Sequence, residues 1–150
     1  MVRTHQLTSE ETVAIFTPTA ARSLFRDMRK KRGRQRQFLS RLHDALTSPT
    51  PQAFVEKPFE GVENLMQFRS GGTMRGYCVF ADESPGYNVF YLFQVTDHAY
   101  DRNPLGRYDA DAGEVPDELR RLSTVEETEA YLAEHDALDA EAIEVILDRI

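Results

Sequence analysis

The sequence predicts a protein of the α+β class, in which one strand and two helices precede three consecutive strands. A short run at 12–16, TVAIF, is rich in residues that favour strands. Apolar residues then recur at helical spacing in two stretches between residues 17 and 48. From 64 to 96, three strand patterns follow one another, separated by turns that contain glycine. The expected order of elements is therefore β-α-α-β-β-β.

The two predicted helices have recognisable ends and should form a hairpin that packs on the sheet. Thr17 followed by Pro18 supplies an N-cap and a proline at the first helical position. The last turn of this helix is expected to be cationic, which suits the helix dipole, and to stop near Gly33. The second helix should end before residues 48–51, where two prolines interrupt it. Its apolar stripe consists of Phe38, Leu39, Leu42, Ala45 and Leu46.

The three later strands are expected at 65–69, 74–81 and 88–96. The last one is a near-continuous apolar run, which is typical of a strand buried on both faces at the centre of a sheet. Because side chains alternate across a strand, Arg75 and Tyr77 should share one face, while Met74, Cys78 and Phe80 face the helices. The sequence thus predicts an antiparallel sheet packed on the two-helix hairpin.

Charge divides the chain into two unequal parts. Residues 1–103 carry 14 Lys+Arg and 11 Asp+Glu, whereas residues 104–150 carry 4 and 14. After Pro104, an acidic segment with the composition of a linker leads into helical patterns capped at Thr124 and Asp139. We therefore expect a core domain, 1–103, and an acidic, mostly helical C-terminal extension, 104–150.

Composition argues against secreted and membrane-spanning classes of protein. The chain holds no run of about 18 apolar residues and no charged leader followed by an apolar segment, so neither membrane insertion nor export is expected. Cys78 is the single cysteine and cannot form an internal disulfide, which fits a reducing compartment. We expect a cytoplasmic protein without a membrane partner; its oligomeric state does not follow from the sequence.

Three segments resemble the RelE/ParE superfamily, whose members are small β-α-α-β-β-β toxins of toxin–antitoxin systems. The segments are TVAIFTPTAARSLFRDM at 12–28, KPFEGVENLMQFRSGGTMRGYCVF at 57–80 and VTDHAYDRN at 95–103. The last one is similar to the His-Arg-Arg-Asp-Val-Tyr ending of many RelE-like members. His98 and Asp101 match that ending, but its basic pair and terminal tyrosine are not present. The likeness covers about two thirds of the chain.

The resemblance implies an activity and a set of partners. RelE-type proteins cleave mRNA, usually in the ribosomal decoding site, ParE-type proteins act on DNA gyrase, and an antitoxin wraps and silences both. For the RelE type, the implied reaction is attack of a ribose 2′-hydroxyl on the adjacent phosphate, with no metal or other cofactor. The expected partners are mRNA, the ribosome and a cognate antitoxin. The alternative is a noncatalytic protein of the same fold that binds gyrase, RNA or an antitoxin.

The resemblance also assigns roles to particular residues. Arg69 and Arg75 are expected to face each other across the Gly-Gly loop and match the family's paired strand arginines. Their planar guanidinium groups suit phosphate binding and stabilisation of transition-state charge. His98 is the candidate acid or base, because an unperturbed histidine pKa of about 6.5 permits either role. Tyr100 completes the predicted catalytic group, and either Tyr100 or Tyr77 could donate a proton or stack on a base. RNA contacts are expected from Lys57, Tyr77, Arg102, Arg32 and Arg34.

Each of these candidate residues also has a purely structural interpretation. Strand arginines often pair with nearby carboxylates, and a histidine at a strand end is often a surface residue. Asp97, His98 and Asp101 also suggest a metal site, but three residues on one loop without a distant fourth ligand are weak evidence, and no metal is expected. The acidic extension has two interpretations: it masks the arginine groove by imitating RNA phosphates, or it packs an apolar edge on the core or on a second copy of the chain. That edge consists of Ile143, Ile146, Leu147 and Ile150.

Overall fold

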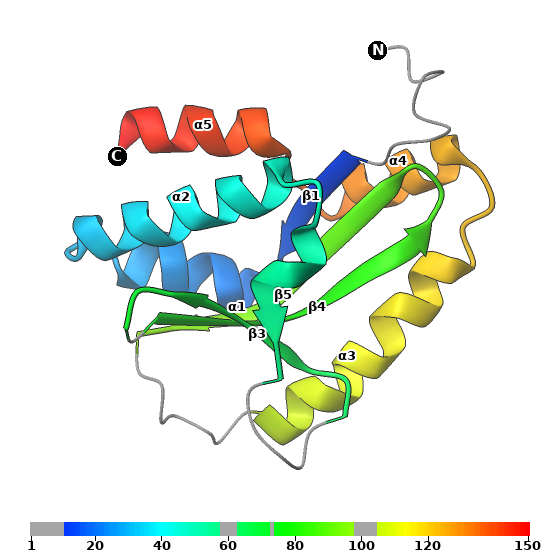
Figure 1. Cartoon of the computed structure of the whole chain (residues 1–150), viewed down its shortest axis with the longest axis horizontal. Helices are drawn as coiled ribbons and strands as arrows, with labels where there is room; N and C mark the ends of the chain where they lie inside the picture. The colour runs from blue at the N-terminus through cyan, green and yellow to red at the C-terminus, as the bar shows by residue number, and fades with distance from the viewer. Residues whose placement is uncertain (1–10, 58–62, 73, 98–104) are drawn as a thin grey trace.

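The computed structural model describes residues 11–57, 63–72, 74–97 and 105–150 and has the predicted α+β class (Figure 1). The strands are β1 (Glu11–Phe16), β2 (Val55–Glu56), β3 (Met66–Ser70), β4 (Met74–Ser84) and β5 (Tyr87–Thr96). The helices are α1 (Pro18–Ala21), its π-helical continuation η2 (Arg22–Asp27), α2 (Arg32–Thr47), the short 3₁₀ turn η3 (Pro51–Phe54), α3 (Leu105–Arg120), α4 (Val125–Glu134) and α5 (Ala140–Arg149). None of the described helices combines the length and apolarity needed to cross a bilayer.

The strands form one mixed sheet in the order β1-β5-β4-β3-β2. The prediction of an antiparallel sheet is wrong for one pair, because β1 runs parallel to β5, with Glu11 opposite Tyr87 and Phe16 opposite Leu92. The other pairs are antiparallel. The reason is that tight turns impose opposite directions on β3, β4 and β5, whereas β1 reaches its partner through a long connection that imposes none.

The first helix begins as predicted but ends elsewhere. The Thr17 hydroxyl accepts a hydrogen bond from the Ala20 N–H at 3.1 Å, and Pro18 occupies the first turn. The helix stops before the expected Gly33, because Met28 is buried and the Lys31 N–H closes a turn on its carbonyl at 2.8 Å. Gly33 therefore lies in the first turn of α2. The cationic residues that were expected at the end of the first helix instead form the connecting turn and the first turn of α2.

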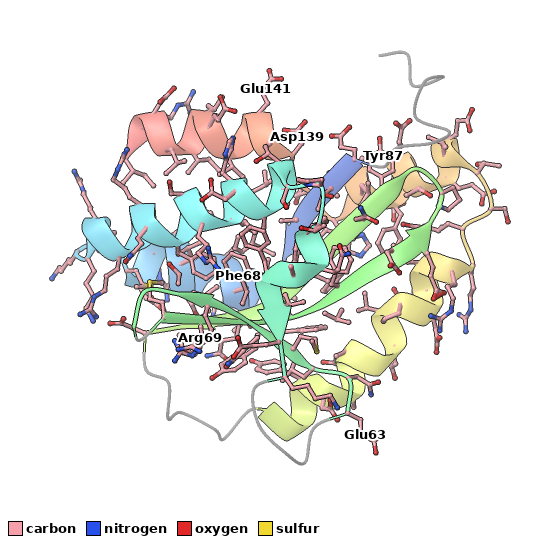
Figure 2. The ribbon with its side chains drawn as sticks, viewed as in Figure 1. Glu63, Phe68, Arg69, Tyr87, Asp139 and Glu141 are labelled. Atoms are coloured by element: carbon pink, nitrogen blue, oxygen red, sulfur yellow. The ribbon has the colours of Figure 1, made fainter. Side chains whose placement is uncertain are left out.

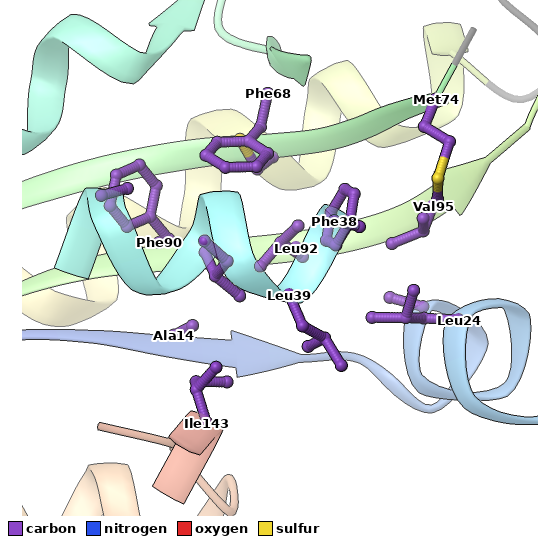
Figure 3. Packing of buried hydrophobic residues seen from close by; sticks show 14 of the residues in the cluster. Ala14, Leu24, Phe38, Leu39, Phe68, Met74, Phe90, Leu92, Val95 and Ile143 are labelled. Carbon is purple, nitrogen blue, oxygen red and sulfur yellow. The ribbon is translucent and has the colours of Figure 1, made fainter. Parts of the chain in front are cut away.

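One face of the sheet, here called the hairpin face, packs against α1, α2 and α5 (Figure 1). Phe38 of α2 is fully buried and meets Phe68 of β3 edge to face, with ring centroids 5.4 Å apart (Figure 3). Gly76 permits this close approach, because a Cβ there would lie 3.0 Å from the Phe38 ring. Met74, Cys78 and Phe80 belong to this core, as the alternation of β4 predicts.

The opposite face, here called the extension face, packs against α3 and α4. The interpretation of the acidic segment after Pro104 as a linker is wrong, because it forms α3 with Pro116 inside the helix. Tertiary burial overrides its glycine, proline and acidic composition, since apolar side chains at helical spacing reach the sheet. These buried side chains are Tyr108, Ala112, Val115 and Leu119.

The remainder of the extension confirms the predicted caps. Thr124 accepts from the Glu127 N–H at 3.1 Å, and Asp139 accepts from the Ala142 N–H at 2.8 Å. Between α4 and α5, Leu138 pairs with Ala14 on the outer edge of β1 through two backbone hydrogen bonds. Ile143 of α5 is fully buried in the hairpin-face core. The extension thus contributes side chains to both cores of the molecule.

Candidate functional site

The register of three strands brings the two candidate arginines together. Arg69 on β3 lies opposite Arg75 on β4, and Arg75 lies opposite Thr96 at the end of β5. Opposed residues of an antiparallel pair project from the same face of a sheet. Figure 2 shows Arg69 on the side of the sheet away from α2 and α5. We call the end of the sheet formed by Arg69, Arg75, Thr96 and Asp97 the arginine edge.

The two arginines differ in their accessibility. The Arg69 side chain is 49% exposed, and its Nη1 lies 3.6 Å from the Glu56 carboxylate of β2, a weak exposed contact. Arg75 is only 8% exposed, and its Nη1 donates to the Met74 carbonyl at 2.9 Å. Arg69 is therefore accessible to an incoming anion, whereas the guanidinium group of Arg75 is buried and held by its own strand.

Asp97, which directly follows β5, connects the same end of the sheet to the basic segment 29–34, here called the basic turn. Lys31 Nζ lies 2.6 Å and Arg34 Nη1 2.5 Å from Asp97 Oδ2. Burial raises the pKa of Asp97, but the hydrogen bonds and charges of Lys31 and Arg34 outweigh it, so that the pKa lies below its usual value. These ion pairs join the start of α2 to the end of β5, two regions that lie more than 60 residues apart in the sequence.

Cations at the start of α2 are electrostatically costly, because the N-terminus of a helix is itself positive. Asp97 offsets this cost for Lys31 and Arg34. Arg32 has a different environment: it is exposed and, with Arg29 and the α5 residue Arg149, lines a cavity of about 280 Å³ between α2 and α5. The two arginines predicted to contact RNA in this turn therefore face different parts of the surface.

Lys57 and Tyr77 also differ in their availability to RNA. Lys57 directly follows β2 and is exposed. Tyr77 is 2% exposed and packs in the extension-face core, which contradicts the prediction that its ring stacks on a base. The physical reason is the presence of α3 over that face, where the sequence was interpreted as a linker. A base could reach the Tyr77 ring only if this layer moved away.

Sequence reasoning missed Asp109 of α3, whose carboxylate accepts hydrogen bonds from the segment that leads into β3. Its Oδ1 accepts from the N–H groups of Asn64 and Leu65, both at 2.8 Å. The hydrogen bond from Leu65 is the largest cause that lowers the pKa of Asp109, and the charge of Lys57 contributes. Asp109 joins α3 to the strand that carries Arg69. No local pattern marked it, because its partners are backbone groups far away in sequence.

Three of the predicted residues, His98, Tyr100 and Arg102, lie outside the described residues. They follow Asp97 in the sequence, and Asp97 is itself held by ion pairs with Lys31 and Arg34. Of the suggested metal ligands, Asp97 alone is described. Within the described ranges, no group of three or more His, Cys, Asp or Glu side chains is arranged to hold a metal ion.

The acidic extension packs on the core, and the corresponding interpretation is confirmed by the full burial of Ile143. The masking interpretation is not supported, because the carboxylate near Arg69 belongs to Glu56 of β2, and Arg75 contacts a backbone carbonyl. Carboxylates of the extension have other partners, among them the hydroxyl of Tyr87, which donates to Glu129 at 2.5 Å.

No protein-family model, no curated protein and no solved structure matches this chain. The general α+β class follows from the coordinates alone. The resemblance to the RelE/ParE superfamily therefore stays a prediction that rests on the quoted segments, and so does every role it assigns to a residue.

Proposed function

We propose that this protein is a RelE-like toxin that binds mRNA at the arginine edge and cleaves it. The observation that carries the proposal is the register of Arg69 with Arg75 and of Arg75 with Thr96. This register sets Arg69 and Arg75 opposite each other and Arg75 opposite Thr96 at the end of β5, two positions before His98 in the sequence. Apart from the two-residue strand β2, the order of β1, two helices and then β3, β4 and β5 agrees with the order that the resemblance implies, which supports the proposal.

The proposed reaction divides the work among four groups. Arg69, which is exposed, binds the scissile phosphate, and Arg75 stabilises the charge that develops on it. His98 accepts the proton of the ribose 2′-hydroxyl, whose oxygen attacks the phosphorus. The bond to the 5′-oxygen breaks, and Tyr100 protonates that leaving oxygen. The products are a 2′,3′-cyclic phosphate and a free 5′-hydroxyl.

The basic turn extends the surface on which RNA would lie. Arg34 and Lys31 reach the end of β5 through Asp97, and about half of each basic side chain remains exposed. Lys57 adds an exposed charge after β2. Exposed cations at several points favour a phosphate backbone over a single small anion. In this proposal mRNA on the ribosome is the substrate, and a cognate antitoxin silences the protein by covering the same edge.

Growth of cells that express the full chain tests the proposal, together with sequencing of RNA ends that carry 2′,3′-cyclic phosphates. We expect arrest and cyclic ends with the wild type, and neither with Arg69→Ala. The matched control is Arg121→Ala, which removes the same charge from an exposed position after α3. Equal arrest and equal cyclic ends in wild type and Arg69→Ala would remove the main support for cleavage.

A noncatalytic binding protein of the same fold is the second candidate. The burial of Arg75 and its hydrogen bond to the Met74 carbonyl favour this candidate. Cleavage needs the Arg75 guanidinium group at the phosphate, and here that group is already engaged within the protein. In that case expression arrests growth without cyclic RNA ends, and His98→Ala is as toxic as the wild type. A gyrase supercoiling assay with purified protein then separates a gyrase partner from an RNA partner.

A further inference from the structure

A cavity of about 520 Å³ lies beside the C-terminal end of β1, between α1, η2 and the segment that joins α4 to α5. We call it the β1 cavity. Four of its lining residues carry aromatic rings: Phe16, Phe25, Tyr91 and His135. Its volume falls within the range of about 300 to 1,000 Å³ that is typical of small-molecule sites. It shares no lining residue with the arginine edge, so it is independent of the proposed nuclease function.

The rings of the cavity support one another. Phe16 and Phe25 lie with their ring centroids 5.6 Å apart, and Tyr91 meets His135 edge to face at 6.2 Å. Behind them, the Tyr131 ring stacks on His135 at 4.1 Å. Such contacts hold the rings in place before any ligand arrives, which reduces the entropic cost of binding.

The polar groups of the β1 cavity accept hydrogen bonds and carry negative charge. The charged side chains in its lining are Glu134 and Asp136, and no lysine or arginine is among the described lining residues. His135 Nδ1 lies 2.8 Å from the Tyr131 carbonyl and must donate to it, so that Nε2 of the neutral ring is an acceptor. The Thr17 hydroxyl already donates to the Phe93 carbonyl at 2.8 Å. The lining therefore suits a ligand that donates hydrogen bonds.

A smaller cavity of about 220 Å³ adjoins the first and shares Thr17 and Tyr91 with it. Three carboxylates from α3 line it: Asp111, Glu114 and Glu118. Burial raises the pKa of Tyr91, and the charges of Glu118 and Asp111 raise it further. Tyr91 thus lies between two cavities that are both lined by carboxylates, in a region of negative potential.

We propose that the β1 cavity binds a small organic cation, a primary amine or guanidinium group on an apolar body. In this proposal the aromatic rings contact the apolar body of the ligand, and the face of one ring attracts its cationic group. Glu134 and Asp136 pair with the positive charge of the ligand. Two sources could supply such a group: a free amine, or an arginine side chain of a partner.

Binding of matched probes to the full chain, measured by calorimetry at low salt, tests the charge requirement. We expect phenethylamine to bind, its neutral counterpart phenethyl alcohol to bind at least about fivefold more weakly, and phenylacetate to bind least. N-acetylarginine N-methylamide represents a partner side chain. Tighter binding of this probe than of phenethylamine assigns the site to a partner, and the reverse assigns it to a free amine. If neither cation binds more tightly than the alcohol, the proposal is overturned.

Asp136 offers a variant that should leave the fold intact. Its φ is 55°, in the left-handed region, where asparagine is tolerated as well as aspartate. Asp136→Asn should therefore keep the melting temperature and weaken phenethylamine binding about fivefold. Asp148→Asn removes the same charge from an exposed position of α5 outside the described cavities and should leave binding unchanged. Equal loss in both variants would show only a long-range effect of net charge and would overturn the assignment to this cavity.

Discussion

The two faces of the sheet are covered in chemically different ways. The hairpin face meets α1, α2 and α5 through aliphatic and phenylalanine side chains such as Phe38 and Phe90. The extension face meets α3 and α4 through a layer rich in tyrosines, where Tyr87 donates to Glu129 and Tyr131 donates to Glu118. A helix that packs through aliphatic side chains is recognisable from periodicity, whereas one that packs through tyrosines and carboxylates resembles a solvated acidic segment in sequence.

Truncation of Phe38 should damage the hairpin face most. Its ring is fully buried between α2 and the sheet, so Phe38→Ala leaves a cavity and should cost about 3 to 5 kcal/mol of unfolding free energy. Urea denaturation measures the loss. The control is Val145→Ala on α5, a residue that is 47% exposed, which should change the unfolding free energy by less than about 0.5 kcal/mol.

Truncation of Leu119 tests whether the extension face is equally a part of the folded core. Leu119 of α3 is fully buried, and Leu119→Ala should cost about 2 to 4 kcal/mol in the same denaturation assay. Arg121→Ala, two residues later and exposed, is the comparison. A loss below about 0.5 kcal/mol would mean that α3 contributes little to the core. The segment after Pro104 would then behave in solution as the linker that its composition suggests.

Asp109 connects the extension to β3 and should make stability depend on pH. Its pKa is lowered in the folded protein, so its contribution is complete above the ordinary aspartate value of about 4 and is lost as pH falls through the lowered value. Asp109→Asn should cost about 1 kcal/mol at pH 7. This difference from the wild type should shrink as the pH falls below about 4. Parallel stability curves over that range, or the same effect in the exposed Asp82→Asn control, would contradict this assignment.

The smallest effect is expected at the junction between the two layers. Asp136 joins α4 of the extension face to α5 of the hairpin face and holds a φ of 55°. Because glycine adopts this conformation without a steric cost, Asp136→Gly should raise the unfolding free energy by about 0.5 kcal/mol. Ala133→Gly, three residues earlier and inside α4, should instead lower it by about 1 kcal/mol. A loss at both positions would show that the left-handed conformation is not strained.

The candidate site could be predicted in part. Arg69 and Arg75 were expected to face each other, and the register confirms this placement. The burial of Tyr77 could not be predicted, because it depends on α3, which begins 28 residues later in the sequence. The link from Lys31 and Arg34 to Asp97 was also missed, since the partners are more than 60 residues apart and no local pattern relates them.

Local chemistry was sufficient to predict where most elements lie and which side chains point together. Thr17, Thr124 and Asp139 cap helices because their side chains satisfy nearby backbone N–H groups, and alternation along β4 separates Tyr77 from Cys78. Packing between distant segments settled the parallel direction of β1, the burial of Tyr77 under α3 and the composition of the arginine edge. These features depend on the free energy of contacts that form only when the whole chain folds, and such contacts leave no periodic trace in the sequence.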